Sequence, residues 1–262
     1  VVVGDNSLRH LKNKKTAGEN MARAKLNLAG NQLNLVKSLD KLNNELIVIY
    51  VNGKPIAEPW IAENINSIIE AWEPGSFGGQ AVGEIIFGEV NPSGKLPLTF
   101  PRSVGQLQMV YNHKPSQYFH KYAEEKITPL YPFGHGLSYS EFMYSDLELK
   151  KSKIEDSSIN ISFLITNNSD TYGEEIVQIY FRDSYSSVTR PVKELVKYKR
   201  VPLNPRESKS LSFSIPIKDL AFYDLNMDLC VEKGNFKFMV GGTSNNKGLI
   251  KASLELLERY DF

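Results

Sequence analysis

The sequence predicts an α/β region followed by an all-β region. Its 262 residues exceed the roughly 150 of a typical domain, so two domains, or one whole and one partial domain, are expected. In the first part, apolar residues recur at helical spacing between short β-branched runs, whereas in the last part they alternate strictly with polar residues. A Pro- and Tyr-rich stretch separates the two patterns. We therefore expect a mainly parallel sheet with helices in residues 1–114, a linker in 115–143 and an antiparallel β-sandwich in 144–262.

The first strand is expected at Val1–Gly4, where three β-branched residues and a glycine fit a buried parallel strand that leads into a loop. The polar and basic stretch Asp5–Asn20 follows and has no lasting period, which indicates a long loop at the carboxyl end of this strand. Loops in this position often carry function.

Helix and strand patterns then alternate. Apolar residues follow the helical period after Asn31: Leu35, Val36, Leu39 and Leu42. The apolar run Leu46–Val51, closed by Asn52-Gly53, predicts a second buried strand. A further set repeats the helical period and predicts a helix that ends before Pro74-Gly75: Ile61, Ile65, Ile68 and Trp72. A short helix is expected from Gly79 to Phe87.

Two groups of residues have a structural interpretation here. Trp60 and Trp72 are able to stack on sugar rings, but aromatic residues at helical spacing beside isoleucines more often belong to a core. The Gly- and Pro-rich stretch Asn91–Pro101 predicts a sharp turn followed by a strand, Leu96–Phe100.

Short strands with one polar face fill the second half. Alternation is strict in three runs: 159–165, 211–215 and 236–240. Apolar runs lie between them at Ile176–Phe181 and Leu195–Val201, with turn signals in between. Strands at this spacing predict an antiparallel β-sandwich.

Composition excludes several classes of function. Lys and Arg total 31 against 30 Asp and Glu, so a net charge of +1 provides no field to hold nucleic acid. The single cysteine, Cys230, cannot form an intramolecular disulfide, and redox chemistry is not expected. The longest apolar run is far shorter than the roughly 20 residues that cross a bilayer. We expect a soluble chain without an export signal of its own, which binds neither membrane nor nucleic acid.

Motifs for common cofactors and metals are absent from the sequence. No phosphate-binding glycine pattern follows the first strand, and Gly134–Ser138 has the wrong order for a nucleophile elbow. The four histidines do not fall at metal-ligand spacing: His10, His113, His120 and His135. We expect no cofactor and no metal.

Several segments are similar to the family 3 glycoside hydrolases, the β-glucosidase and β-xylosidase group: Glu70–Gly75, Gly78–Val82, Phe87–Pro101, Tyr131–Phe142, Gly173–Tyr180 and Arg190–Leu195. The resemblance implies an N-terminal barrel that carries an Asp nucleophile, then an α/β sandwich domain that supplies the acid/base, then a fibronectin type III-like domain. It identifies this chain as the C-terminal part, with the α/β sandwich domain beginning half-way and the barrel absent.

The resemblance also implies a catalytic residue. Gly18-Glu19, Arg23 and the segment Leu26–Gln32 match the family's loop after the first strand, with Ala29 where proline is usual. Glu19 is thereby the candidate general acid/base, and Arg23 a candidate substrate-binding residue. A retaining glycosidase needs such a carboxylic acid about 5 to 5.5 Å from a nucleophilic carboxylate. From the residues alone, Glu19 is one solvated carboxylate among 30 acidic residues.

Two hypotheses stand at this point. The first is the C-terminal portion of a retaining exo-β-glycosidase that hydrolyses terminal β-linked sugars, with the missing barrel and a β-linked glycoside as partners and with no activity in this chain alone. The second is a non-catalytic scaffold or carbohydrate-contacting module, which has no need of Glu19 and Arg23 on a long loop. The sequence selects neither the sugar nor a periplasmic, secreted or cytoplasmic location.

Overall fold

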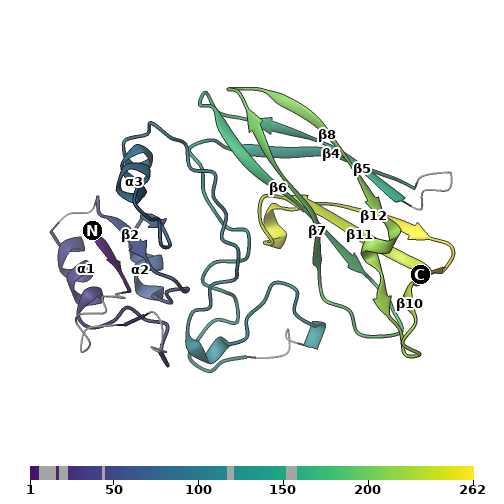
Figure 1. Ribbon diagram of the computed structural model, residues 1–262, viewed down its shortest axis with the longest axis horizontal. Coiled ribbons are helices and arrows are strands. Elements are labelled where there is room, and N and C mark those ends of the chain that lie inside the picture. Colours follow the sequence, from purple (N-terminus) through teal and green to yellow (C-terminus); the bar gives the residue numbers. More distant parts are fainter. Residues whose placement is uncertain (6–15, 18–22, 43–44, 117–120, 152–157) are drawn as a thin grey trace. The chain divides into compact units, whose positions relative to one another are not determined.

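A computed structural model describes residues 1–5, 16–17, 23–42, 45–116, 121–151 and 158–262 (Figure 1). The chain divides into two compact units. The α/β unit comprises Val1–Val90, Thr99–Met109 and Lys121–Tyr131. The sandwich unit comprises Asn91–Leu98, Val110–His120 and Pro132–Phe262.

A parallel three-stranded sheet forms the centre of the α/β unit, in the order β1-β2-β3. Its strands are β1 (Val2–Gly4), β2 (Ile47–Val51) and β3 (Ser67–Glu70). The helices are α1 (Gln32–Asp40), α2 (Pro59–Asn64) and α3 (Gly78–Ile86), with a 3₁₀ turn at Val104–Gln106. This arrangement confirms the expected parallel pairing of the first two strands and the helices after Asn31 and Gly79.

The core of the α/β unit lies between the sheet and its connecting helices. Val36 of α1, Val48 of β2 and Ile61 of α2 are completely buried, together with Val3 of β1 at 4% exposure. Trp60 packs against this cluster, as expected of a core residue. Because parallel strands are linked by helices that pack on the sheet, one apolar cluster fixes both kinds of element.

The helix predicted from Ile61 to Trp72 is wrong in its second half. α2 ends at Asn64, Ile65 is extended with φ −103° and ψ 120°, and Ser67–Glu70 is strand β3, paired with β2. Spacing of three to four residues does not separate helix from strand in a short run of isoleucines, and two adjacent β-branched residues, Ile68 and Ile69, favour a strand between buried layers.

The predicted strand Leu96–Phe100 is also wrong. Within the sandwich unit, Leu96 exchanges backbone hydrogen bonds with Gly134 and His135, and within the α/β unit Phe100 forms a single bridge with Tyr131. Pro97 has no N–H to continue a ladder, so pairing stops after Leu96.

Two antiparallel sheets make up most of the sandwich unit. One has the order β12-β11-β6-β7 and the other β4-β5-β8. Their strands are β4 (Phe142–Lys151), β5 (Ser158–Asn167), β6 (Gly173–Asp183), β7 (Glu194–Leu203), β8 (Ser208–Pro216), β11 (Gly234–Gly241) and β12 (Ile250–Leu256). A small third sheet contains β9 (Phe222–Tyr223), β10 (Leu229–Val231) and β13 (Tyr260–Asp261), and 3₁₀ turns occur at Ile217–Leu220 and Asn246–Gly248.

Inward side chains of both large sheets form one core. Ile161 and Phe163 of β5 contribute to the same buried cluster as Ile179 of β6 and Phe238 of β11. Their alternation with polar neighbours is the pattern that predicted these strands.

The Gly- and Pro-rich stretch after α3 has a structural role in the sandwich unit. The Asn91 side chain donates to the Ser140 hydroxyl and the Tyr172 carbonyl, both at 2.9 Å, and accepts from Tyr139 N at 2.8 Å. Lys95 pairs with Glu175 at 3.3 Å. These contacts fasten residues 91–98 to the strands, which agrees with the structural interpretation of this motif.

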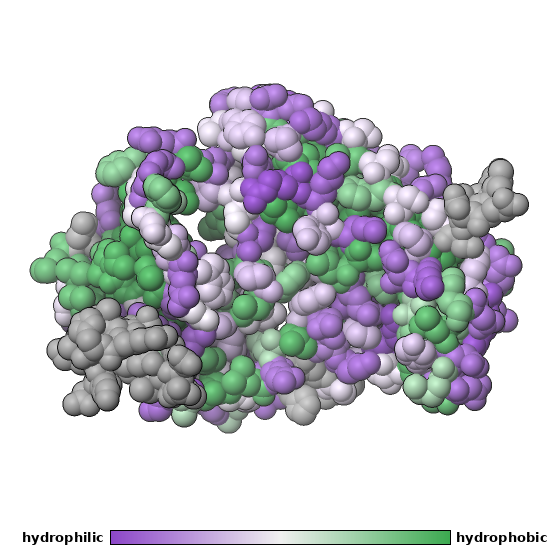
Figure 2. Space-filling view, in the orientation of Figure 1, coloured by the Kyte–Doolittle hydropathy of each residue, from purple (hydrophilic) through white to green (hydrophobic). Residues whose placement is uncertain are grey.

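Apolar side chains also remain at the surface of the α/β unit, where Figure 2 shows hydrophobic residues in green. Among the large exposed ones are Val2, Leu35, Phe77 and Phe87. They lie on edge strand β1, on α1 and at the two ends of α3.

Candidate active site

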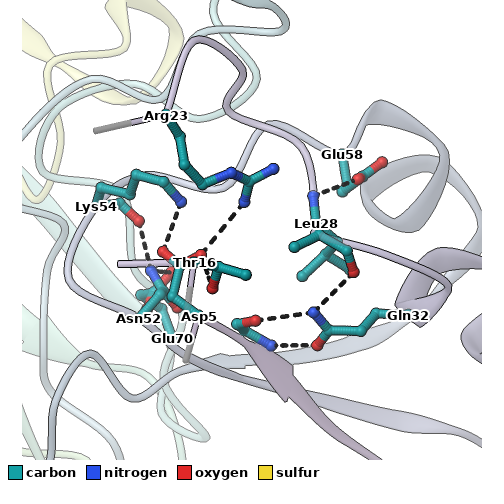
Figure 3. Close-up of polar contacts among 11 residues, drawn as sticks. Asp5, Thr16, Arg23, Leu28, Gln32, Asn52, Lys54, Glu58 and Glu70 are labelled. Atoms are coloured by element: carbon teal, nitrogen blue, oxygen red, sulfur yellow. Dashed lines mark hydrogen bonds and ion pairs between the residues drawn. The ribbon is translucent and has the colours of Figure 1, made fainter. Parts of the chain in front are cut away.

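The carboxyl ends of the three parallel strands bring together a polar cluster (Figure 3). Asp5 follows β1, Asn52 follows β2, and Glu70 ends β3. Ligands of open α/β sheets bind at this edge, because the loops that leave parallel strands converge there. We take these residues and their partners as the candidate site.

Gly4 sets the geometry at the end of β1. Its φ is +150°, and a Cβ atom at this position would lie 1.9 Å from the carbonyl oxygen of Val51. The Gln32 side chain brackets the same residue, accepting from Gly4 N at 2.8 Å and donating to Gly4 O at 2.9 Å. The Gly4 backbone, from which Asp5 leaves the sheet, is therefore held by Gln32 and lies close against the Val51 carbonyl.

The Asp5 carboxylate is the centre of an ion-pair cluster. Its Oδ1 accepts from Arg23 Nη1 at 3.3 Å and from Thr16 Oγ1 at 3.5 Å, and its Oδ2 accepts from Lys54 Nζ at 2.6 Å. The Asp5 side chain is 4% exposed, against 18% for Arg23 and 25% for Lys54. One buried carboxylate is thus flanked by two cations.

Asn52 and Glu70 form a second pair beside it. Asn52 Nδ2 donates to the Lys54 carbonyl at 2.6 Å and to Glu70 Oε2 at 3.5 Å, while Trp72 N donates to Glu70 Oε1 at 3.1 Å. Burial raises the pKa of Glu70 to about 7, and the hydrogen bonds that Glu70 accepts from Trp72 and Asn52 act in the opposite direction. The Asn52 Oδ1 atom is buried and has no hydrogen-bond partner among the described residues. Glu70 is thus a carboxyl group that changes charge near neutral pH.

Glu58 fastens the chain that follows Arg23. Its Oε1 accepts from Leu28 N at 2.7 Å, and Ala57 N donates to the Leu26 carbonyl at 3.0 Å. Burial raises the pKa of Glu58, and the hydrogen bond from Leu28 acts in the opposite direction. The segment from Arg23 to α1 is therefore tied to the start of α2.

The two predicted site residues have different outcomes. Glu19 lies outside the described residues, so its role stays a prediction. Arg23 is described and contacts Asp5. The sequence reasoning did not single out Asp5, Asn52, Lys54 or Glu70. The signal that finds three of them is a polar residue at or directly after the end of a buried strand.

Neither a metal-binding cluster nor a membrane-spanning helix occurs in the described ranges. There, no three His, Cys, Asp or Glu side chains gather closely enough to hold a metal ion. No helix of the described chain combines the length and apolarity needed to span a membrane.

Two known protein families match this chain. The glycosyl hydrolase family 3 C-terminal domain matches residues 1–139, and the fibronectin type III-like domain matches residues 175–244. A β-xylosidase from Formosa agariphila is 40% identical over 92% of this chain, and a periplasmic β-glucosidase from Salmonella typhimurium is 35% identical over 92%.

Solved structures agree in fold. A β-glucosidase from Erythrobacter marinus superposes with a TM-score of 0.88 at 35% identity over 98% of this chain and 34% of its own. A β-glucosidase from Listeria innocua in complex with glucose gives 0.87 at 29% identity over 97% of this chain and 36% of its own. This chain spans about one third of the length of the curated relatives that it matches, 34% and 33% for the first two. By the match over residues 1–139, the chain belongs to glycosyl hydrolase family 3, of which it contains the C-terminal domain followed by a fibronectin type III-like domain.

Proposed function

We propose that this chain is the C-terminal portion of a retaining exo-β-glycosidase. The observation that carries the proposal is the family match over residues 1–139, joined to relatives named β-xylosidase and β-glucosidase that align with 92% of this chain. The substrates are terminal β-linked glucosyl or xylosyl residues, and the partner is an N-terminal barrel that supplies the Asp nucleophile.

Glu19 acts in this proposal as the general acid/base. It protonates the oxygen of the departing sugar in the first step, and it deprotonates the attacking water in the second step. Its loop leaves the sheet at Asp5, the edge where α/β domains bind ligands. The Arg23 guanidinium has five N–H donors, of which one nitrogen contacts Asp5 among the described residues, and in this proposal the group also donates to a substrate hydroxyl.

The domain organisation is part of the same proposal. Residues 1–114 form the C-terminal half of the α/β sandwich domain, 115–143 the linker and 144–262 the fibronectin type III-like domain. The exposed side chains of Val2, Leu35 and Phe77 support a missing neighbour for the α/β unit, because large apolar side chains gain free energy when a further layer covers them.

The test is Glu19→Ala in the intact enzyme, with two classes of substrate. Alkyl β-glycosides need a proton to leave, whereas a dinitrophenyl glycoside departs without one. We expect the alkyl substrates to slow by about 10²- to 10⁴-fold, because that range is the usual contribution of a general acid. Hydrolysis of the activated substrate should then be limited by the second step.

Azide provides the second readout. It replaces the water that Glu19 would deprotonate, so it should accelerate the activated substrate in Glu19→Ala and yield a β-glycosyl azide. Glu63→Gln is the control, since Glu63 is half-exposed and its partners are Arg102 and Lys126. Wild-type rates for both substrate classes in Glu19→Ala would assign the acid/base elsewhere and would favour the scaffold hypothesis for this chain.

A further inference from the structure

One carboxylate contacts both described segments that flank Glu19 in the sequence. Thr16 lies three residues before Glu19 and Arg23 four residues after it. The Thr16 hydroxyl and the Arg23 guanidinium both donate to the same oxygen, Asp5 Oδ1, at 3.5 and 3.3 Å. Asp5 thereby ties the two sides of this loop to one point.

The second oxygen of the same carboxylate is held as well. Lys54 Nζ donates to Asp5 Oδ2 at 2.6 Å, and the Lys54 backbone carbonyl accepts from the buried Asn52 side chain at 2.6 Å. Without the negative charge of Asp5, Arg23 and Lys54 would face each other as two like charges in a partly buried place. The charge of Asp5, beyond its shape, is what keeps Arg23 in position.

Asp5 itself is anchored to the sheet. Its backbone N donates to Val51 O at 3.0 Å, and the preceding Gly4 is held on both sides by Gln32. A group fixed by a strand end positions its partners more precisely than one on a loop.

We propose that Asp5 is a positioning residue for the acid/base of this enzyme. Its carboxylate holds Thr16 and Arg23, the described residues on either side of Glu19 in the sequence, and through them it supports the proton transfers assigned to Glu19. This inference rests on the proposed function of Glu19. It adds a specific device, made of Asp5, Thr16, Arg23 and Lys54, that the family match does not assign.

The experiment compares Asp5→Asn, Glu19→Ala and Glu63→Gln in the intact enzyme. Asp5→Asn keeps the size of the side chain and removes its charge. Displacement of a catalytic group by about 1 Å costs roughly 10²-fold in rate, so we expect alkyl β-glycosides to slow by about that factor. The dinitrophenyl glycoside should slow much less in its first step, and azide should accelerate its turnover, as in Glu19→Ala. Glu63→Gln should behave as the wild type does.

A purely structural role predicts a different result. It would lower the melting temperature and reduce the rates of both substrate classes by the same factor, with no response to azide. That outcome for Asp5→Asn, alongside the split in Glu19→Ala, would overturn the inference and leave the proposed function intact. Absence of the split in Glu19→Ala itself would overturn the proposed function, and the inference with it.

A double-mutant cycle with Arg23→Met sharpens the test. If Asp5 acts through Arg23, the double variant should lose no more activity on the alkyl glycoside than the more damaged single variant, because the two residues act as one unit. Multiplicative losses would show that Asp5 and Arg23 act independently and would contradict the mechanism.

Discussion

The two units place their buried charges differently. In the sandwich unit they are dispersed: Lys95 pairs with Glu175, while Arg190 pairs with Glu194 and lies over the ring of Phe222 at 4.6 Å. Each of these contacts joins neighbouring strands or loops. In the α/β unit, the acidic groups Asp5 and Glu70 gather at one edge of one sheet.

This difference in charge placement is typical of a structural scaffold in the sandwich unit and of a binding site in the α/β unit. Dispersed pairs satisfy the polar groups of a core and orient strands, whereas groups at one strand edge face the place where loops meet a ligand. Both tryptophans of the chain, Trp60 and Trp72, belong to the α/β unit. Tryptophan fluorescence therefore reports on that unit, and far-UV circular dichroism, dominated by the larger β-structure, reports mainly on the sandwich.

Gly4→Ala should have the largest effect on the α/β unit. The new Cβ would lie 1.9 Å from Val51 O, so β1 cannot keep its pairing and the expected loss of stability is at least about 4 kcal/mol. The fluorescence transition should disappear or move far down in temperature, while the β-sheet signal persists. Gly83→Ala is the matched control. Its Cβ would meet nothing within 4 Å in α3, and it should stabilise the unit by about 0.5 to 1 kcal/mol. A normal fluorescence transition in Gly4→Ala would contradict the strained geometry.

Phe238→Ala should have the converse effect on the sandwich unit. Phe238 of β11 is fully buried, and removal of a buried phenyl ring costs about 3 to 5 kcal/mol. Chemical denaturation followed by circular dichroism should shift strongly, with a smaller shift by fluorescence. A fluorescence transition that shifts more than the circular dichroism transition would contradict the assignment of the two signals to the two units.

Glu70 should make the stability of the α/β unit depend on pH. Burial raises its pKa to about 7 in the folded state, so the folded unit binds a proton more tightly than the unfolded chain does. The contribution of Glu70 to stability should therefore be greatest at acidic pH and should fall as pH rises from about 4.5 to 7. We expect the free energy of unfolding to decrease by about 2 kcal/mol, which is less than the full pKa shift implies because water still reaches part of the carboxylate. The measurement is fluorescence-detected urea denaturation between pH 5 and 8.

Glu70→Gln should flatten this profile and raise stability at pH 8, since an uncharged amide replaces the buried carboxylate. Glu63→Gln, at a half-exposed ion pair, should leave the profile as it is and change stability by no more than about 0.5 kcal/mol. An unchanged pH dependence in Glu70→Gln would assign the titration to another group.

The same contrast explains what the sequence could predict. Strict alternation at 159–165 and 236–240 has a single structural solution when one face is buried, and the sandwich strands were predicted correctly. The isoleucines up to Ile68 follow the helical spacing, but pairing with β2, which is a long-range interaction, makes Ser67–Glu70 a strand. Pro97 ended a predicted strand for a local reason that the sequence already contained.

The site was predictable in part. Glu19 and Arg23 follow from a motif, but the cluster around Asp5 depends on Lys54, 49 positions away, and on a register between β1 and β2 that no local pattern specifies. A search for polar residues at the ends of predicted parallel strands would have selected Asp5, Asn52 and Glu70 without naming their partners.

The most direct test of the central claim is covalent trapping in the intact enzyme. A 2-deoxy-2-fluoro-β-glycoside with a good leaving group forms a stable glycosyl-enzyme, because retaining hydrolysis proceeds through such an intermediate. After digestion, mass spectrometry should find the label on an Asp outside these 262 residues, and the isolated chain should take up none. A label on any carboxylate within residues 1–262 would contradict the claim that this chain supplies the acid/base while the barrel supplies the nucleophile.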